Sequence, residues 1–222
     1  MRTIAACDSR WNALTSKLRP SVHGAAMDMW QAFMSSTSKS VPKARIVHDK
    51  FHIAKYLGEA VDKVRRAEHR DFKKDGENPL TGRRQLFLYN EENLDEDSYS
   101  EVLKVQRADL KIGRAWAIKE HFRHFWDYAT RSWGQRFFDR WYSWAIRSRL
   151  DPIKKVAVML KNPLEGLLNH FDHRITNASS EGFNSRIQSI KSAARGFRKF
   201  ANYRIPISFY CGELEMLPET GH

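Results

Sequence analysis

The chain has 222 residues, a mass of 26.0 kDa, a net charge of +12 at neutral pH and a pI of about 9.8. Its hydrophobic fraction of 41% excludes a disordered tail, and no apolar run reaches the roughly 20 residues of a membrane span. Two cysteines, Cys7 and Cys211, are too few for a disulfide framework, so we expect a soluble, cytoplasmic protein. The positive charge favours nucleic acid as a partner, although a merely basic or ribosome-associated protein would share it.

The first fifty residues alternate between helix and strand patterns. Residues 8–20 are typical of a capped helix that ends at its proline, and residues 21–27 are a short apolar run that predicts a buried strand. Residues 29–34 predict a helix with residues 35–42 as its exit loop, and residues 43–48 predict a second buried strand. Strand, helix and strand with short links predict a parallel crossover unit.

The middle of the chain is helical in pattern. Apolar residues recur at helical spacing from Ile53 over about 20 residues, and an acidic segment at 91–97 predicts a solvated loop. Tryptophans and phenylalanines, including Trp133 and Trp144, recur at helical spacing over residues 98–170, which predicts the core of a helical bundle rather than a base-stacking surface. A further helix is predicted from Asp151 to about residue 163, and the histidine pairs in this region lack the partners of a zinc site.

The last predicted helix, residues 179–194, carries one acid, Glu181, at its start. Phe183 and Ile187 belong to its apolar stripe, and Glu181 lies on the opposite, polar side. From residue 182 to 204 all six charged residues are positive. A lone carboxylate at the head of a cationic helix suggests a metal ligand beside a phosphate backbone, as in a polynucleotidyl transferase. The alternative is an acid that offsets the helix dipole.

Three further polar residues stand where the predicted strands end. Asp28 follows the first strand, at the edge where open parallel sheets bind ligands, and it could hold a divalent cation or merely cap the next helix. Asp49 and His52 lie one helical turn apart after the second strand. They could face the same site, with His52 orienting a carboxylate or contacting phosphate, or they could be a helix cap and a hydrogen-bonded histidine.

Taken together, these segments resemble the bacterial DDE transposases of the ISL3 insertion-sequence family. The resemblance covers the chain from about residue 20 onward and rests on residues 25–30, 46–53, 59–69, 114–120, 141–152, 175–191 and 196–200. It implies an α/β, predominantly helical chain with a ribonuclease-H-like fold and a large all-α insertion.

The resemblance also implies a domain organisation and roles for the acids. Residues 1–52 would form a partial core, 53–174 the helical insertion, 175–205 the final catalytic helix with its basic segment, and 206–222 a tail. Asp28 would be the second catalytic acid and Glu181 the third, while Asp49 and His52 match the Asp-x-x-His of related transposases. Whether Asp28 or Asp49 is the second acid stays open, and the position at a strand end favours Asp28.

The family's first three strands, its first catalytic Asp and its zinc-binding and helix-turn-helix region have no counterpart here. We therefore expect the C-terminal portion of a transposase, truncated and lacking the first acid. An intact relative would use Mg²⁺ or Mn²⁺ to cleave transposon ends and transfer them into target DNA, as a homo-oligomer in the bacterial nucleoid. The expected DNA-binding residues are Asn184, Arg186, Gln188, Lys191, Arg195, Arg198 and Lys199. The alternatives are an inactive DNA-binding fragment that acts as a competitor or regulator, and an RNA-binding helical protein.

Overall fold

A computed structural model describes residues 4–14, 17–74, 84–108 and 110–175, and the single positions 76, 80, 82, 185, 189, 190 and 192. The chain divides into two units, residues 1–175 and 176–222, and all elements described below belong to the first. Apart from those single positions, the helix predicted over residues 179–194 lies outside the described residues, as do Glu181 and the seven expected DNA-binding residues.

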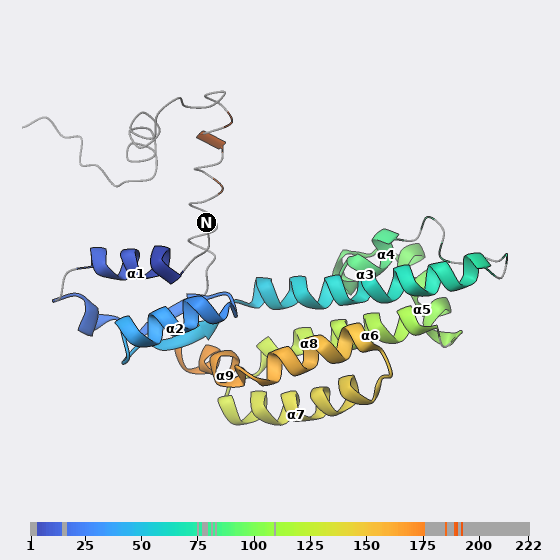
Figure 1. Ribbon diagram of the computed structural model, residues 1–222. Coiled ribbons are helices and arrows are strands. Elements are labelled where there is room, and N and C mark those ends of the chain that lie inside the picture. The colour runs from blue at the N-terminus through green and yellow to red at the C-terminus, as the bar shows by residue number, and fades with distance from the viewer. Residues whose placement is uncertain are drawn as a thin grey trace, which may run out of the picture. The chain divides into compact units, whose positions relative to one another are not determined.

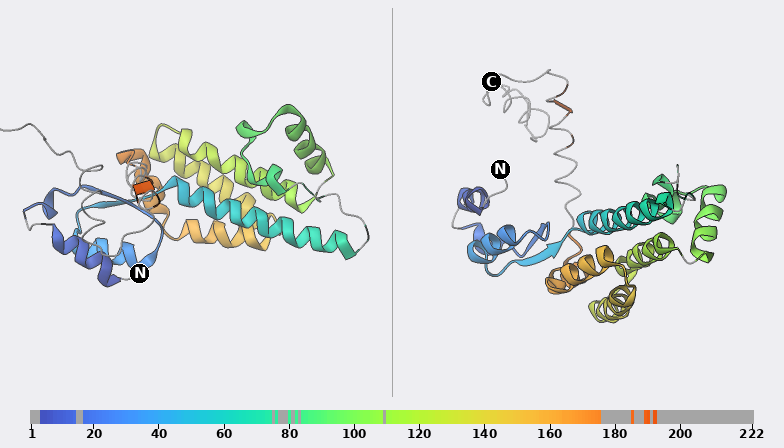
Figure 2. Two further views of the ribbon diagram at one scale, coloured as in Figure 1. Left: turned by 90° about the horizontal axis from the view of Figure 1, so that it is seen from above. Right: turned by 45° about the vertical axis from the view of Figure 1, so that its right-hand side comes forward.

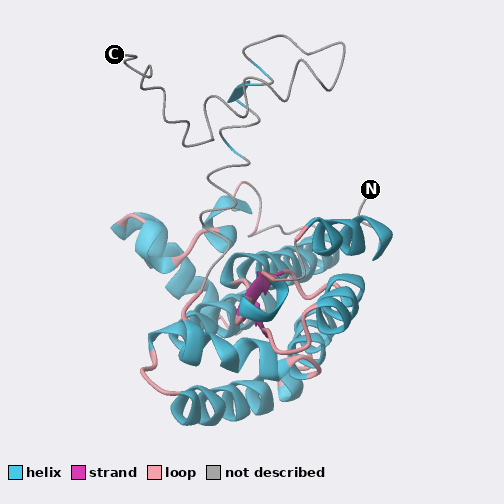
Figure 3. Ribbon diagram, turned by 90° about the vertical axis from the view of Figure 1, so that its left-hand side faces the viewer, coloured by secondary structure: helices cyan, strands magenta, loops and turns pink. Residues whose placement is uncertain are grey.

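Two short parallel strands form the sheet, as the crossover pattern predicted. Helix α1 (Ile4–Ala13) and the 3-10 turn η1 (Arg19–Ser21) precede strand β1 (Gly24–Met27), and helix α2 (Gln31–Ser40) leads to strand β2 (Arg45–His48). The strands pair in register from Gly24 with Arg45 to Met27 with His48. Figure 3 shows them side by side, with helices around them.

The predicted boundaries of the first two helices were wrong. The helix expected over residues 8–20 lies at Ile4–Ala13, and Pro20 sits in the first turn of η1, where a missing N–H costs nothing. Helix α2 continues to Ser40, through the predicted exit loop. Its serine- and threonine-rich sequence has low helix propensity, but Thr37 is buried and Ser36, also buried, hydrogen-bonds Asp8 of α1. Packing against α1 and β1 therefore overrides propensity.

The rest of the described chain is a helical bundle (Figures 1 and 2), which confirms a predominantly helical α/β chain. Its longest element, α3 (Lys50–Lys74), starts three residues before the predicted position and packs against α6 and α8. Helix α7 packs against α6, α8 and α9. The remaining elements are α4 (Arg84–Leu88), η2 (Glu91–Asn93), α5 (Glu96–Arg107), α6 (Lys111–Arg123), η3 (His124–Asp127), α7 (Arg131–Arg147), α8 (Asp151–Lys161) and α9 (Leu164–His173). None of the helices in the described part of the chain could cross a bilayer.

Most of the aromatic residues of the bundle form its core, as predicted. Phe122 and Phe125 stack at 5.4 Å between ring centroids, and the indole N–H of Trp141 donates to the Ile118 carbonyl at 2.9 Å. The prediction was wrong for two tryptophans of α7, because Trp133 and Trp144 are exposed. Trp133 lies at the start of α7, and Trp144 meets only the ring of His121 of α6 among the ring contacts of the described residues.

Candidate functional site

Asp28 directly follows β1 and is held from two directions. Its carboxylate is only 9% exposed, and Oδ1 accepts the Met29 N–H at 2.7 Å and the Tyr56 hydroxyl of α3 at 3.1 Å. Helix α2 begins at Gln31, and its N-cap residue is Trp30, which makes no side-chain cap bond. Asp28 therefore does not cap α2, and its side chain is directed to α3 instead.

Asp49 directly follows β2 and caps α3. It is 5% exposed, its carbonyl accepts the Ile53 N–H at 3.4 Å, and its Oδ1 accepts the Phe51 N–H at 3.0 Å. These two bonds are the pattern of an N-cap aspartate. Its second oxygen, Oδ2, is buried without a hydrogen-bond partner among the described residues. Capping accounts for one oxygen of this carboxylate, and the other remains available to a ligand.

The two carboxylates follow the paired residues Met27 and His48, so parallel pairing brings them to the same edge of the sheet. The Asp49 N–H donates to the Met27 carbonyl at 3.2 Å, which extends the pairing by one residue. His52, one turn into α3, has its Nδ1 3.9 Å from Asp28 Oδ2. The sequence-predicted residues Asp28 and His52 thus come together and Asp49 follows the neighbouring strand end, whereas Glu181 lies outside the described residues.

His48 is the last residue of β2 and is buried next to Asp49 in the chain. Burial lowers the pKa of His48, although a hydrogen bond with the Met27 backbone and the charge of Asp28 act in the opposite direction. The imidazole is therefore neutral near pH 7. Gly166 of α9 packs directly on its ring, since a Cβ at that position would lie 2.4 Å from the His48 Nε2 atom.

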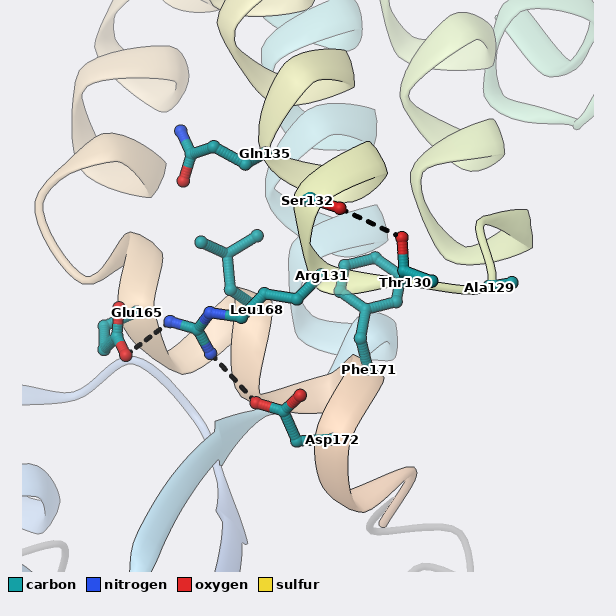
Figure 4. Close-up of a pocket in the computed structure, with 9 residues that line it drawn as sticks. All are labelled: Ala129, Thr130, Arg131, Ser132, Gln135, Glu165, Leu168, Phe171 and Asp172. Atoms are coloured by element: carbon teal, nitrogen blue, oxygen red, sulfur yellow. Dashed lines mark hydrogen bonds and ion pairs between the residues drawn. The ribbon is translucent and has the colours of Figure 1, made fainter.

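Helix α9 is tied to the backbone of β2 by Asn169. Its side-chain amide donates to the Ile46 carbonyl at 2.8 Å, and its oxygen accepts from Arg131 of α7 at 3.0 Å. Arg131 also bonds Asp172 at 3.0 Å and Glu165, as Figure 4 shows for the pocket of about 690 Å³ that these residues line. The sheet edge is thereby fixed to the helical bundle.

Sequence reasoning missed Tyr56 and Asn169. Tyr56 had a readable signal, because it lies four residues after His52 and therefore on the same face of α3. Asn169 had none, since its partner lies 123 positions away in the chain. Only the packing of α9 on β2 brings that pair together.

The residues present fit a hard divalent cation in part. Carboxylate oxygens are the ligands that Mg²⁺ prefers, and the buried, unpartnered Oδ2 of Asp49 is such an atom. Within the described residues, no group of three or more His, Cys, Asp or Glu side chains could hold a metal ion. Glu181, the third acid expected from the sequence, lies outside these residues.

Comparison with known proteins identifies the family. A family model described as "Transposase", that of the ISL3-type DDE transposases, matches residues 1–207. The transposases for insertion sequence element IS1557 of two Mycobacterium tuberculosis strains, CDC 1551 and H37Rv, are each 26% identical over 180 residues. The match covers 71% of this chain and 40% of each relative, so the chain spans less than half of their length. No solved structure matches the chain significantly. The chain therefore belongs to the ISL3-type family of insertion-sequence transposases.

Proposed function

We propose that this chain forms part of the catalytic domain of a DDE transposase that cleaves DNA and transfers strands in the transposition of an insertion sequence. The observation that carries the proposal is the pair of buried carboxylates at the carboxyl ends of adjacent parallel strands. In a family of transposases, such a pair suits a metal-assisted attack on phosphate.

The proposed fold is a ribonuclease-H-like core over residues 1–52 and 175–205, with residues 53–174 as a helical insertion. The insertion leaves the core along α3, which runs without a break across residue 52. Asn169 and Gly166 return the insertion to the second strand, because both contact β2 from α9. Residues 206–222 are the tail.

Asp28 and Glu181 are the proposed metal ligands and catalytic acids. Asp28 is our first choice over Asp49, because Asp49 caps the first turn of α3, whereas Asp28 makes no cap bond to α2, the helix that follows it. The bonds from Met29 and Tyr56 fix Asp28 Oδ1, and His52 lies beside Oδ2, so the carboxylate is oriented before any ligand arrives. Asp49 remains the second candidate for the same role.

A bound Mg²⁺ or Mn²⁺ would supply the positive charge that activates water or a 3′-hydroxyl and stabilises the leaving oxygen. The chain's own residues would bind the cation and the DNA and orient them toward each other. Asp28 and Glu181 would hold the cation, and His52 would position Asp28 or contact phosphate. The polar and basic residues Asn184, Arg186, Gln188, Lys191, Arg195, Arg198 and Lys199 would hold the backbone of transposon-end and target DNA, with little base readout. We further propose that the intact protein acts as a homo-oligomer in the bacterial nucleoid.

The test is metal-dependent nicking of plasmid DNA that carries the terminal repeats, measured together with Mn²⁺ binding by electron paramagnetic resonance. Asp28→Asn and Glu181→Gln are each expected to lower Mn²⁺ affinity and, at the matching positions of an intact relative, to abolish nicking, with DNA affinity roughly unchanged. Asp97→Asn, which removes an exposed acid of α5, serves as the charge-matched control. Unchanged Mn²⁺ binding in the Asp28 and Glu181 variants would reject the assignment.

A second candidate function is DNA binding without cleavage, as a competitor or regulator of transposition. The net charge of +12 favours it, since charge alone confers affinity for DNA. The same experiment separates the two functions. A wild-type chain that binds DNA and Mn²⁺ but leaves the plasmid intact would support the second.

A further inference from the structure

One exposed side of α7 carries two tryptophans and three arginines. Trp133 is 49% exposed and Trp144 41% exposed, and the arginines between and after them are exposed as well. We refer to this set as the α7 strip: Trp133, Arg136, Arg140, Trp144 and Arg147. Its spacings of three and four residues keep all five side chains on one side of the helix.

The α7 strip is separate from the face that α7 contributes to the core. Phe137, Phe138 and Trp141 are buried against α6, α8 and α9, and the strip lies on the adjoining flank. Exposing about half of each tryptophan side chain is unfavourable in free energy, because a large apolar ring surface stays in contact with water. Core packing therefore does not explain their presence on this flank.

The arginines of the strip differ from several others in the bundle, which are held in ion pairs. Arg65 and Arg66 bind Asp62, and Arg131 binds Glu165 and Asp172. No described carboxylate forms an ion pair with Arg136, Arg140 or Arg147. The strip is thus a row of guanidinium groups without counter-charges.

Both tryptophans of the strip have close ring contacts. The guanidinium of Arg136 lies 5.1 Å from the ring centroid of Trp133. At the other end, the ring of His121 meets Trp144 at 5.7 Å. The acid of α7, Asp139, points off the strip and accepts a bond from Gln135. Positive charge and aromatic faces therefore coincide over about four turns of helix.

We propose that the α7 strip binds single-stranded DNA, with the arginines on phosphates and unpaired bases stacked on Trp133 and Trp144. Guanidinium groups along a backbone and aromatic faces for bases are the two components of such surfaces. The tryptophans are eleven residues apart, about 16 Å along the helix, which is room for a short run of nucleotides. The choice of DNA rather than RNA rests on the proposed transposase function. The site is distinct from the carboxylates at the sheet edge.

The experiment measures binding of the 222-residue chain to a fluorescein-labelled oligothymidylate and to a labelled duplex by fluorescence anisotropy, over a series of salt concentrations in EDTA. Trp144→Ala and Trp133→Ala are expected to weaken oligothymidylate binding at least about fivefold each, with a smaller effect on the duplex. Arg140→Gln is expected to weaken both and to reduce the salt slope by about one. The basic segment after residue 182 contributes equally to every variant, so it cancels in the ratios.

Two matched variants control for the general loss of an exposed aromatic ring or charge. Tyr89→Ala removes an exposed ring from the end of α4, and Arg107→Gln removes an exposed arginine from α5. Both should bind oligothymidylate as the wild type does. Strip variants that match these controls would overturn the proposal, as would a loss confined to the duplex. Because EDTA removes metal, this result stays independent of the nicking assay that tests the proposed catalysis.

Discussion

Asp28 owes its orientation to a residue of another element, the Tyr56 hydroxyl of α3. In Tyr56→Phe the carboxylate keeps the Met29 N–H but loses a donor in a part-buried setting. The free energy of unfolding in EDTA should fall by about 1–2 kcal/mol, because a hydrogen bond to a charged group is lost. Mn²⁺ affinity should fall as well, since Asp28 is then less well oriented. Urea unfolding and paramagnetic resonance measure the two effects.

The control for this prediction is Tyr142→Phe. Tyr142 is half-buried on α7, and its hydroxyl makes no hydrogen bond with the described residues. Its removal should leave both the free energy of unfolding and Mn²⁺ affinity unchanged. Equal stability and equal Mn²⁺ affinity of Tyr56→Phe and wild type would show that Tyr56 does not position Asp28.

His170 gives the bundle a dependence on pH. Burial, followed by the charges of Arg174 and Lys50, lowers the pKa of His170. In the unfolded chain the histidine protonates below about pH 6.5, whereas in the folded chain it resists protonation. The unfolded state therefore binds more protons in that range, and the free energy of unfolding falls as pH falls below about 6.5.

His170→Gln should remove the contribution of His170 to the pH dependence of the free energy of unfolding. Urea unfolding between about pH 5 and pH 7 is expected to give a flatter slope for the variant than for the wild type. His48 and His121, whose pKa values are also lowered by burial, keep part of the slope. His23→Gln, at an exposed position, is the control. A slope identical to that of the wild type would contradict the role of His170.

At the scale of elements, α3 and α6 are joined by one buried acid. Both oxygens of Glu68 accept backbone N–H groups at the start of α6, those of Lys111 and Ile112, each at 2.8 Å. The start of α6 has no side-chain cap of its own, so a residue 43 positions earlier supplies it. Sequence patterns identify α6 as a helix, but they do not show what satisfies its first amides.

Glu68→Ala should destabilise the protein by about 2 kcal/mol, because two amide donors at a helix N-terminus lose a charged acceptor. Glu59→Ala, which removes an exposed acid from the same helix, should change stability by less than about 0.5 kcal/mol. Chemical denaturation of both variants measures the difference. Equal stabilities would mean that water replaces the cap at no cost.

At the scale of the whole described unit, the contact between α9 and β2 connects the helical bundle to the sheet. Gly166 permits that contact, because an added Cβ would lie 2.4 Å from two atoms of the buried His48 ring. Gly166→Ala should therefore cost more than about 2 kcal/mol, since the His48 ring is enclosed and α9 would have to shift. Gly58→Ala on α3 meets nothing within 4 Å and should stabilise by up to about 1 kcal/mol. Thermal unfolding of this pair tests whether the connection depends on close packing.

The sequence by itself determined the parallel strands, the helical bundle and the family. These features follow from local patterns: apolar runs, helical spacing, and strand ends that carry Asp28 and Asp49. The same patterns predicted the start of α8 at Asp151, where proline in the first turn reinforces the signal. Local chemistry suffices for such features because the interacting residues are near one another in the chain.

Only the tertiary structure decided the contacts made over long separations. The length of α2 depends on packing against α1, and the exposure of Trp133 and Trp144 depends on how the neighbouring helices pack around α7. Whether an aspartate at a strand end caps a helix was also decided by geometry, since Asp49 bonds the first amides of α3 whereas Asp28 turns to Tyr56. A pattern fixes which residues a helix or strand presents, but the partner that meets them depends on how the whole chain packs.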